Sequence, residues 1–451
     1  MTDTAIPLGN ITLFGFTHNV EGFLKQRVEQ RLGITPQTID FGPAAHFFFY
    51  TSDGDVATSE EAMALRLGFI RSEEQTPRSA GQLLQQNQVT PEAISYDQLR
   101  GNGLVACFDK KSPQFSVYQT LIGFPTIFYS RIDEGIVCAT GLRALLPLVD
   151  RVELNEEAVP THFLFEMMPG TDTYFRDISR MYPGQLLQWR DGDLTVRRVK
   201  DLRPREGDPV YHTREAAFDA LQTRMDQTMA AYIAQLEAAS AGIANLLSGG
   251  VDSSILQLFI NRHLPESKTP QSLTFAVNDA PSFEFEIGYA RHASELFKTE
   301  HTFIDILPED YPTYLTKTIE ILGQPTLINE GQACYYGMMQ QITQQRPDFG
   351  YFFNGQAADA LHGASVVKKI LLYDKSRKIP GARFGYQLLA SLVGAIAPKK
   401  SDGFQEIATL IAEDNNPNSL LTPPKNTDIA NFDWPRRFFG DEAILKALNK
   451  R

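Results

Sequence analysis

The sequence predicts a mixed α/β protein in which a region of antiparallel sheet is followed by a doubly wound parallel sheet. Two observations predict this order. Up to about residue 205, short apolar runs are separated by turn residues, which is typical of antiparallel strands. Beyond that residue, short apolar strands alternate with amphipathic helices, as in repeated βαβ units. Residues 201–209 combine charges with two prolines and a glycine, and they mark the predicted boundary between domains 1–205 and 206–451.

The first domain contains six apolar runs of strand length, several of them flanked by Gly, Asp or Asn. The expected strands are Asn10–Phe16, Ala45–Tyr50, Gly103–Phe108, Phe115–Tyr118, Thr126–Tyr129 and Gly135–Ala139. Their spacing leaves room for only a few helices. We therefore expect packed antiparallel sheet over most of this domain.

The second domain opens with a long helix from Thr213 to about Leu236, rich in Ala, Gln, Met and Leu. The expected strands that follow are Ile243–Leu247, Ser272–Val277, His301–Asp305 and Gly350–Phe353. The expected helices are Ser253–His263, Glu286–Phe297, Asp310–Leu322 and Gly331–Gln345. In a parallel sheet of this kind, ligands bind at the carboxyl ends of the strands.

Composition limits the function classes. A chain of 451 residues with 43% hydrophobic and 21% charged residues is typical of a folded globular protein with two domains. The net charge of -12 argues against nucleic acid and anionic lipid as partners. Without a membrane-spanning apolar run or a secretory signal, we expect a cytoplasmic protein. The cysteines lie in apolar runs without metal-ligand spacing, which favours buried thiols: Cys107, Cys138 and Cys334.

A candidate phosphate loop, Ser248-Gly249-Gly250-Val251-Asp252-Ser253-Ser254, lies between the strand ending at Leu247 and a helix. Glycines let backbone amides approach an anion, and the start of the helix adds free N–H groups and the positive end of its dipole. The hydroxyls that add further donors belong to Ser248, Ser253 and Ser254. A Ser/Gly turn with an N-capping Asp is the plainer interpretation, but the full string between strand and helix favours phosphate binding.

The loop lacks the G-K-[ST] of a Walker sequence and resembles the PP-loop of ATP pyrophosphatases, which cleave ATP between the α and β phosphates. Its Asp252 would repel phosphate unless a divalent cation lies between them, so Mg2+ is implied. Asp359 follows the strand ending at Phe353 and is the second expected Mg2+ ligand. Taken alone, Asp359 reads as a helix cap; beside the loop it reads as a metal ligand.

The segment Asn354–Gly363 resembles the S-G-E-G-x-D-E-L-F-G-G segment of the asparagine synthetase family. Between the phosphate loop and this segment, three further stretches resemble family segments in the same order: 274–277, 299–301 and 319–326. The resemblance implies ATP and Mg2+ as ligands and a sheet of the adenine nucleotide α-hydrolase type. It further implies nucleotide contacts from Leu246, Gly249, Gly250, Val277 and Gly355. Gln356 stands where asparagine synthetases carry Glu and β-lactam synthetases carry a catalytic Tyr, which makes it a candidate catalytic residue.

The N-terminal domain resembles the glutamine amidotransferase domain of the same family, an Ntn-hydrolase-like αββα sandwich. The matching segments are 101–109, 123–129, 136–146, 175–178 and 182–184. A working domain of this kind starts with Met-Cys-Gly, whereas this chain has Thr2 and Asp3. Thr serves as an N-terminal nucleophile in other folds. The Glu-Ile-Tyr-Asn segment that binds glutamine is also missing from residues 47–54, so we expect a scaffold without glutaminase activity.

From about residue 364 the sequence predicts a shortened, helical tail with pieces at Leu388–Ala397 and Phe404–Ala412. The family's phosphate-binding lysine has no clear counterpart here, and Lys446 is the candidate for its role. Residues 366–400 carry eight basic residues against one acidic residue, which indicates a solvated face or a contact with pyrophosphate or an acidic peptide. Ala360 replaces a family Glu. Tail and replacement together raise the alternative that a partner chain supplies missing C-terminal elements.

These features predict an ATP-dependent ligase that adenylates a substrate carboxylate and lets an amine displace AMP. The substrate would carry both groups and could be a peptide, giving a lactam or macrolactam as in β-lactam synthetases and lasso-peptide cyclases. The alternatives are a non-catalytic or partner-dependent nucleotide-binding subunit and an ammonia-dependent amidation of the asparagine synthetase type. Sulfur or nitrogen insertion into nucleic acid is a further chemistry of PP-loop proteins. It would require reactive cysteines or an RNA-binding domain, and the sequence indicates neither.

Overall fold

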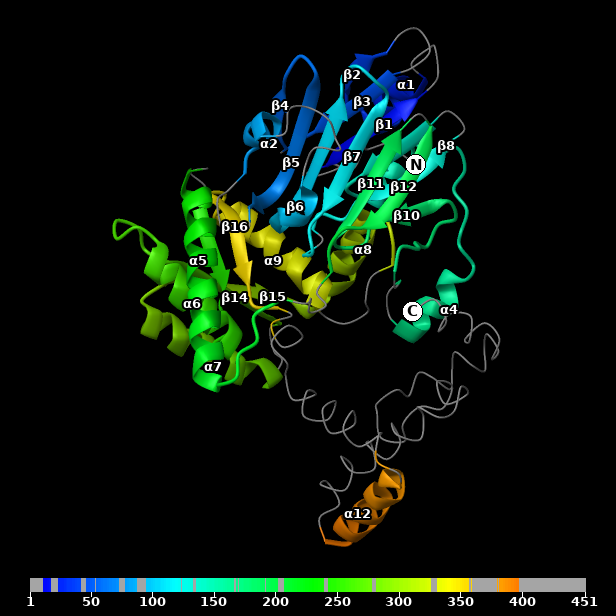
Figure 1. Ribbon diagram of the computed structural model, residues 1–451. Coiled ribbons are helices and arrows are strands. Elements are labelled where there is room, and N and C mark those ends of the chain that lie inside the picture. Colours follow the sequence, from blue (N-terminus) through cyan, green and yellow to red (C-terminus); the bar gives the residue numbers. More distant parts are fainter. Residues whose placement is uncertain are drawn as a thin grey trace. The chain divides into compact units, whose positions relative to one another are not determined.

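The structure of the protein is a computed structural model. It describes residues 11–17, 23–41, 46–52, 54–72, 78–86, 95–122, 124–132, 135–165, 168, 170–190, 192–201, 207–238, 242–277, 281–325, 331–356, 358, 379 and 381–396. The chain divides into two compact units, one of Met1–Leu154 with Thr171–Asn354, the other of Asn155–Gly170 with Gly355–Arg451. Both antiparallel and parallel sheets lie in the first unit (Figure 1). The boundary expected near residue 205 stays a prediction.

One six-stranded antiparallel sheet, sheet A, has the strand order β10-β8-β9-β1-β3-β2. Its strands are β1 (Thr12–Thr17), β2 (Gln37–Asp40), β3 (His46–Thr51), β8 (Phe128–Ile132), β9 (Gly135–Ala139) and β10 (Ile178–Arg180). A second, sheet B, has the order β12-β11-β7-β6-β5-β4. Its strands are β4 (Asp55–Thr58), β5 (Ala62–Arg71), β6 (Arg100–Asp109), β7 (Gln114–Gln119), β11 (Gln185–Arg190) and β12 (Asp193–Arg198).

The two antiparallel sheets pack face to face around an aromatic core (Figure 1). Phe14 and Phe47 of sheet A lie 5.5 Å and 4.3 Å, between ring centroids, from Phe108 of sheet B. Burying each such ring contributes about 1.5–3 kcal/mol. The outer face of sheet A packs against helices α1 (Phe23–Leu32) and α3 (Leu142–Leu145), and that of sheet B against α2 (Ala80–Gln86) and η1 (Tyr96–Gln98). The layers are therefore α, β, β and α, while the relationship to Ntn hydrolases stays a prediction.

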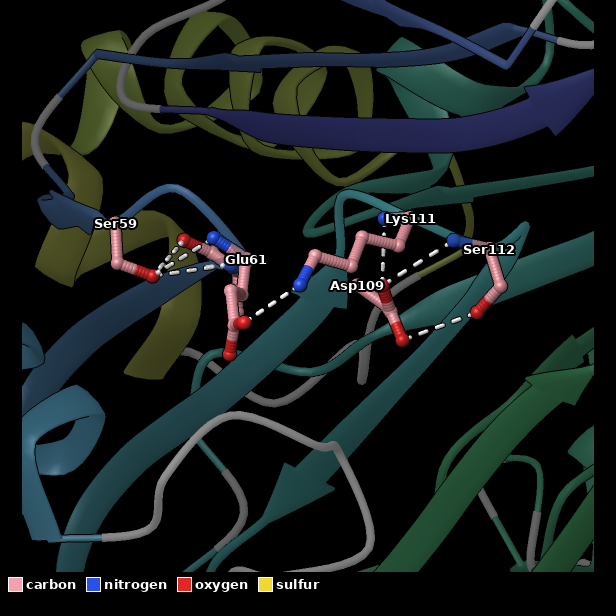
Figure 2. Close-up of polar contacts among 6 residues, drawn as sticks. Ser59, Glu61, Asp109, Lys111 and Ser112 are labelled. Atoms are coloured by element: carbon pink, nitrogen blue, oxygen red, sulfur yellow. Dashed lines mark hydrogen bonds and ion pairs between the residues drawn. The ribbon is translucent and has the colours of Figure 1, made fainter.

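A polar cluster joins two turns at one end of sheet B (Figure 2). The carboxylate of Asp109 accepts hydrogen bonds from the backbone N–H groups of Lys111 and Ser112, from the Ser112 hydroxyl and from the Gln114 amide, at 2.6–3.2 Å. Lys111 Nζ reaches Glu61 Oε1 in the neighbouring turn at 2.5 Å. Burial alone would raise the pKa of Asp109, but these hydrogen bonds stabilise the charged form and lower it.

The long helix α5 (Arg214–Ala238) begins as predicted, because the Thr213 hydroxyl accepts a hydrogen bond from the Ala216 N–H at 3.2 Å. It leads into a parallel sheet, sheet C, with the strand order β15-β14-β13-β16. Its strands are β13 (Gly242–Leu246), β14 (Gln271–Val277), β15 (Glu300–Ile306) and β16 (Phe349–Asn354). The predicted parallel sheet is confirmed, with strand ends within two residues of the expected ones.

Helices cover both faces of sheet C. On one face, Ile243 packs among residues of α5 and α6 (Val251–His263). On the other face, Ala244 packs among residues of α8 (Tyr311–Leu322) and α9 (Gly331–Gln345). Helix α7 (Pro281–Phe297) contacts β14 and β15, and the 3-10 turn η2 (Pro308–Asp310) precedes α8. Adjacent residues of β13 thus enter different cores, as expected for a strand buried on both sides.

The second unit contains helices α4 (Ala158–Phe165) and α12 (Ala382–Ile396) among its described residues. Helix α12 confirms the helix expected at Leu388–Ala397 and begins six residues earlier. The helix expected at Phe404–Ala412 lies outside the described residues. In the part of the chain that the structure describes, every helix is too short or too polar to cross a membrane.

Candidate functional site

The predicted phosphate loop lies between the carboxyl end of β13 and the first turn of α6, as the sequence indicated. Gly249 takes a φ of 77°, a conformation that favours glycine. A Cβ atom added there would lie 2.4 Å from the carbonyl carbon of Tyr289 and 2.5 Å from its oxygen. Two reasons therefore require glycine at position 249: its backbone conformation and the close approach of α7.

Ser253 holds the loop in its conformation through hydrogen bonds. Its side chain is 5% exposed, and its Oγ accepts a hydrogen bond from the Ser248 N–H at 3.2 Å and donates one to the Gly250 carbonyl at 3.2 Å. The Ser248 hydroxyl bonds to Ser253 Oγ at 3.1 Å and accepts from the Gly250 N–H at 3.3 Å. These contacts fix the loop backbone before any ligand binds. Ser253 thus has a structural part in the loop, alongside the phosphate contact that was predicted for it.

Three side-chain amides, two of them buried, connect the loop to neighbouring elements. Asn245 in β13 is fully buried and donates to the Ser253 carbonyl and to Gln257 Oε1, both at 3.0 Å. Gln257 donates to Asn261 at 2.8 Å, and Asn261 donates to the Phe297 carbonyl at 2.8 Å. The network joins β13, α6 and the end of α7. Each of its amide nitrogens donates a hydrogen bond, while the buried Asn245 Oδ1 has no partner among the described residues.

The loop lies at the point where the strand order of sheet C reverses. Leu246, the last residue of β13, pairs with Leu273 of β14 on one side and with Asn354 of β16 on the other. The Thr274 hydroxyl donates to the Leu247 carbonyl. Asn354 donates from its amide to the Tyr335 hydroxyl at 3.2 Å. Ligands of doubly wound sheets bind in the crevice at such a switch point.

The structure brings only part of the predicted site together. Leu246 and the Ser248–Ser254 loop meet at the end of β13, and half-buried Val277 ends β14 next to it. Gly355 and Gln356 follow β16 but belong to the second unit, where Gly355 is half-buried and Gln356 exposed. Asp359 and Lys446 lie outside the described residues, so their predicted roles in metal binding and catalysis stay predictions.

The carboxylate of Asp252 is exposed in the first turn of α6. It makes no ion pair with the residues that the structure describes, so it is available to a cation. Over the described ranges, no three His, Cys, Asp or Glu side chains come together as a metal site. A magnesium ion needs only one or two protein carboxylates, because phosphates and water complete its octahedron. The donor set present at the loop therefore fits Mg2+ bound together with a phosphate ligand.

Sequence reasoning missed two residues that shape the site, Asn245 and Thr274. Asn245 interrupts the apolar strand Ile243–Leu247, and a polar residue in a buried strand is a signal for a hydrogen-bonded network. Thr274 gave no comparable signal, because Thr is frequent in strands for its β-branched shape alone.

All three cysteines are buried, as predicted. Burial raises the pKa of the Cys107 thiol to about 12 and raises that of Cys138 as well. A thiol protonated at neutral pH is a poor nucleophile. These two side chains therefore serve as packing residues.

Over part of its length, the chain is similar to the asparagine synthase family and to asparagine synthetases. The asparagine synthase family profile matches residues 226–431, slightly less than half of the chain. The glutamine-hydrolyzing asparagine synthetase 1 of Bacillus subtilis is 21% identical over 288 residues, which cover 62% of this chain and 42% of that protein. A putative glutamine-hydrolyzing asparagine synthetase of Mycobacterium tuberculosis is 20% identical over 275 residues, or 60% and 40%.

The chain thus spans about two fifths of the length of these curated relatives. Among solved structures, the glutamine phosphoribosylpyrophosphate amidotransferase of Bacillus subtilis, complexed with ADP and GMP, is similar over 78% of this chain and 92% of that one. Its sequence identity is 11% and its TM-score 0.25, too low for a shared fold to be stated.

Proposed function

We propose that the protein is an ATP-dependent carbon–nitrogen ligase that forms AMP and pyrophosphate. The observation that carries this proposal is the preorganised loop from Ser248 to Ser254, at the switch point of a parallel sheet and within the segment that matches the asparagine synthase family. In the first step, a substrate carboxylate oxygen attacks the α-phosphorus of ATP and the bond to pyrophosphate breaks. In the second, an amine attacks the acyl adenylate, forms the amide, loses a proton and releases AMP.

The chain's own contribution to the first step is positioning and charge neutralisation. The N–H groups of Ser248 and Gly250 are used within the loop, so the N–H groups in the first turn of α6 would bind the anion, and the half-buried Ser254 would add its hydroxyl. Because Ser253 fixes the loop through three hydrogen bonds, little reorganisation is needed when pyrophosphate forms. Asp252, together with Asp359, would hold Mg2+, which when bound offsets the negative charge of the phosphates.

The amine is proposed to come from the substrate itself, giving a lactam or a peptide macrolactam in natural-product biosynthesis. Thiol-dependent glutamine hydrolysis requires an accessible thiolate, and the chain's three cysteines are all buried. Free ammonia as the amine, with asparagine synthetase-type amidation, is the competing version of the same chemistry. A binding subunit without turnover is the alternative outcome.

Pyrophosphate release from ATP by the purified full chain tests the proposal. The reaction is run with Mg2+ and with candidate carboxylates: L-aspartate plus ammonium chloride, and peptides that carry a free amine and a side-chain carboxylate. Asp252→Ala is expected to lower the rate by about a hundredfold or more, since it removes a charge-neutralising ligand of the transition state. Asp219→Ala, which removes an exposed carboxylate of α5, is the matched control and should leave the rate unchanged.

Three results separate the versions. Release with the peptides but not with ammonium supports the intramolecular amine. Release that requires ammonium supports free ammonia. If Asp252→Ala keeps the wild-type rate, or if no candidate releases pyrophosphate although ATP binds, the ligase proposal is wrong and the binding-subunit alternative stands.

A further inference from the structure

The β5–β6 strand pair has the Asp109 cluster at one end, and its opposite end contacts helix α5, about 160 residues further along the chain. The ring of Phe69 stacks on that of Tyr232, with centroids 3.7 Å apart. The Arg71 Nη2 group donates to the Thr228 hydroxyl at 3.4 Å. The Tyr232 ring in turn meets Phe353, near the end of β16, at 6.2 Å. This junction therefore joins sheet B to the half of the unit that carries the phosphate loop.

Arg71 is incompletely satisfied at this junction. Its Nε and Nη1 atoms are buried and have no hydrogen-bond partner among the described residues. Its one hydrogen bond is long and goes to a neutral hydroxyl. A guanidinium has five N–H donors, and leaving them buried without acceptors costs free energy that a folded protein normally recovers through an anionic partner.

Among the described residues, the charged side chains that act on Arg71 are arginines. Arg71 pairs directly across the strands with Arg100, and like charges in that position repel each other. Arg224 lies one helical turn before Thr228 on α5. Burial lowers the pKa of Arg71, and Arg224 and Arg100 lower it further. Within the described ranges, no carboxylate forms an ion pair with Arg71, although the chain as a whole carries a net charge of -12.

We propose that this junction is a binding site for a small oxyanion, with Arg71 as its principal ligand and Arg224 and Arg100 as supporting charges. The guanidinium presents parallel N–H donors that match the two oxygens of a carboxylate or phosphate group. Arg224 is exposed, so the cluster is open to solvent on its side, and the Phe69–Tyr232 stack lies at the same junction. The site is separate from the phosphate loop and does not require the proposed ligase activity.

The recognised chemistry is that of an oxyanion, and its two sources are a carboxylate-bearing metabolite and free phosphate. Thermal unfolding of the full chain is measured in sodium chloride, sodium phosphate and sodium succinate at equal ionic strength and pH. Succinate and phosphate distinguish the sources. We expect at least one of them to raise the Tm of the wild type by about 3 °C or more over chloride, because a ligand of the native state stabilises it.

Arg71→Met keeps an unbranched apolar side chain and removes the guanidinium charge. Its anion-dependent rise in Tm should be clearly smaller than that of the wild type, while it unfolds in chloride at or above the wild-type temperature, since its buried cation is gone. Arg214→Gln, an exposed charge at the start of the same helix, controls for net charge and should keep the full rise. Any phosphate bound at the Ser248–Ser254 loop contributes equally to all three proteins.

The proposal is overturned if Arg71→Met shows the same rise as the wild type, or if neither anion raises the wild-type Tm over chloride. Should Arg71→Met fail to fold, Arg224→Gln replaces it, because Arg224 is exposed. Calorimetric titration with the active anion is then expected to show at least about threefold weaker binding for Arg224→Gln than for Arg214→Gln. Equal affinities would overturn the proposal. Asp252→Ala should keep the anion effect. A failure of the anion-site proposal can therefore be distinguished from a failure of the ligase proposal.

Discussion

Each end of the β5–β6 strand pair carries a charged side chain, and the two side chains differ in how many hydrogen bonds they make. At one end, Ala62 pairs with Asp109, whose carboxylate accepts four hydrogen bonds from its own turn, those from Lys111 and Ser112 being drawn in Figure 2. At the other end, Arg71 pairs with Arg100 and donates one long hydrogen bond. Both side chains are largely covered by protein. Only the carboxylate has its charge compensated locally.

The difference separates a structural charge from a candidate binding site. A buried charge whose hydrogen-bonding capacity is used within its own turn is explained by folding alone. One that is left with unused donors, facing like charges, is explained only by a ligand or by a cost that folding tolerates. The same reasoning applies at the phosphate loop, where Ser253 is satisfied internally while Asp252 is exposed and unpaired among the described residues.

Gly101, next to Arg100, gives the largest expected effect at the arginine end. Its φ is 122°, and an added Cβ would lie 2.0 Å from the Phe69 carbonyl oxygen. Gly101→Ala is expected to lower the free energy of unfolding by about 3 kcal/mol or more, from backbone strain and overlap with the partner strand. Urea denaturation measures this loss.

Gly33 provides the matched control for Gly101. It also has a positive φ, of 68°, but an added Cβ would meet nothing within 4 Å. Gly33→Ala should therefore lose only about 1 kcal/mol. If both variants lose the same free energy, close strand contact is not what requires glycine at residue 101.

Asp109 tests the carboxylate end with the next largest effect. Asp109→Ala removes the acceptor for four donors in a side chain that is 9% exposed, and we expect a loss of about 2–3 kcal/mol in the free energy of unfolding. Ser112→Ala removes only one of the four bonds and should lose about 1 kcal/mol or less. A loss for Asp109→Ala no larger than that for Ser112→Ala would show that the turn does not depend on the carboxylate.

The same carboxylate predicts a smaller effect of pH. Because the hydrogen bonds lower the pKa of folded Asp109, its stabilising contribution is present above the ordinary carboxyl pKa of about 4 and disappears as the pH falls through the lowered value. The stability difference between wild type and Asp109→Asn should be constant above about pH 5 and shrink below about pH 4. Denaturation at a series of pH values measures it, and a difference that grows on acidification would contradict the assignment.

The parallel sheet and its helices could be predicted from the sequence because their periodicity is local. Thr213 caps α5 as expected, and the predicted limits of α9, Gly331 and Gln345, match the structure. Strand β5 was missed, although it is among the longest. It is buried on both faces, between sheet A and α2, so it lacks the alternation that marks a half-buried strand.

The phosphate loop was predictable for the same local reason, since glycines, hydroxyls and a helix start lie within seven residues. The arginine junction was not. Whether Arg71 finds an acceptor depends on Thr228, 157 residues away in the sequence, and on how α5 packs against sheet B. No local pattern carries that information, because an unsatisfied donor is a property of the tertiary neighbourhood.

The smallest expected effect is that of breaking the Lys111–Glu61 pair. This pair lies in the same cluster as Asp109, but both of its side chains are exposed. Its atoms approach to 2.5 Å, closer than any of the four hydrogen bonds of Asp109, but the side chains are 65% and 46% exposed. Water solvates both charges when the pair separates, so Lys111→Gln should leave the free energy of unfolding unchanged within error. A double-mutant cycle with Glu61→Gln checks that the coupling is near zero. A coupling as large as the loss in Asp109→Ala would mean that contact distance, and not burial, decides which charges at this strand pair matter.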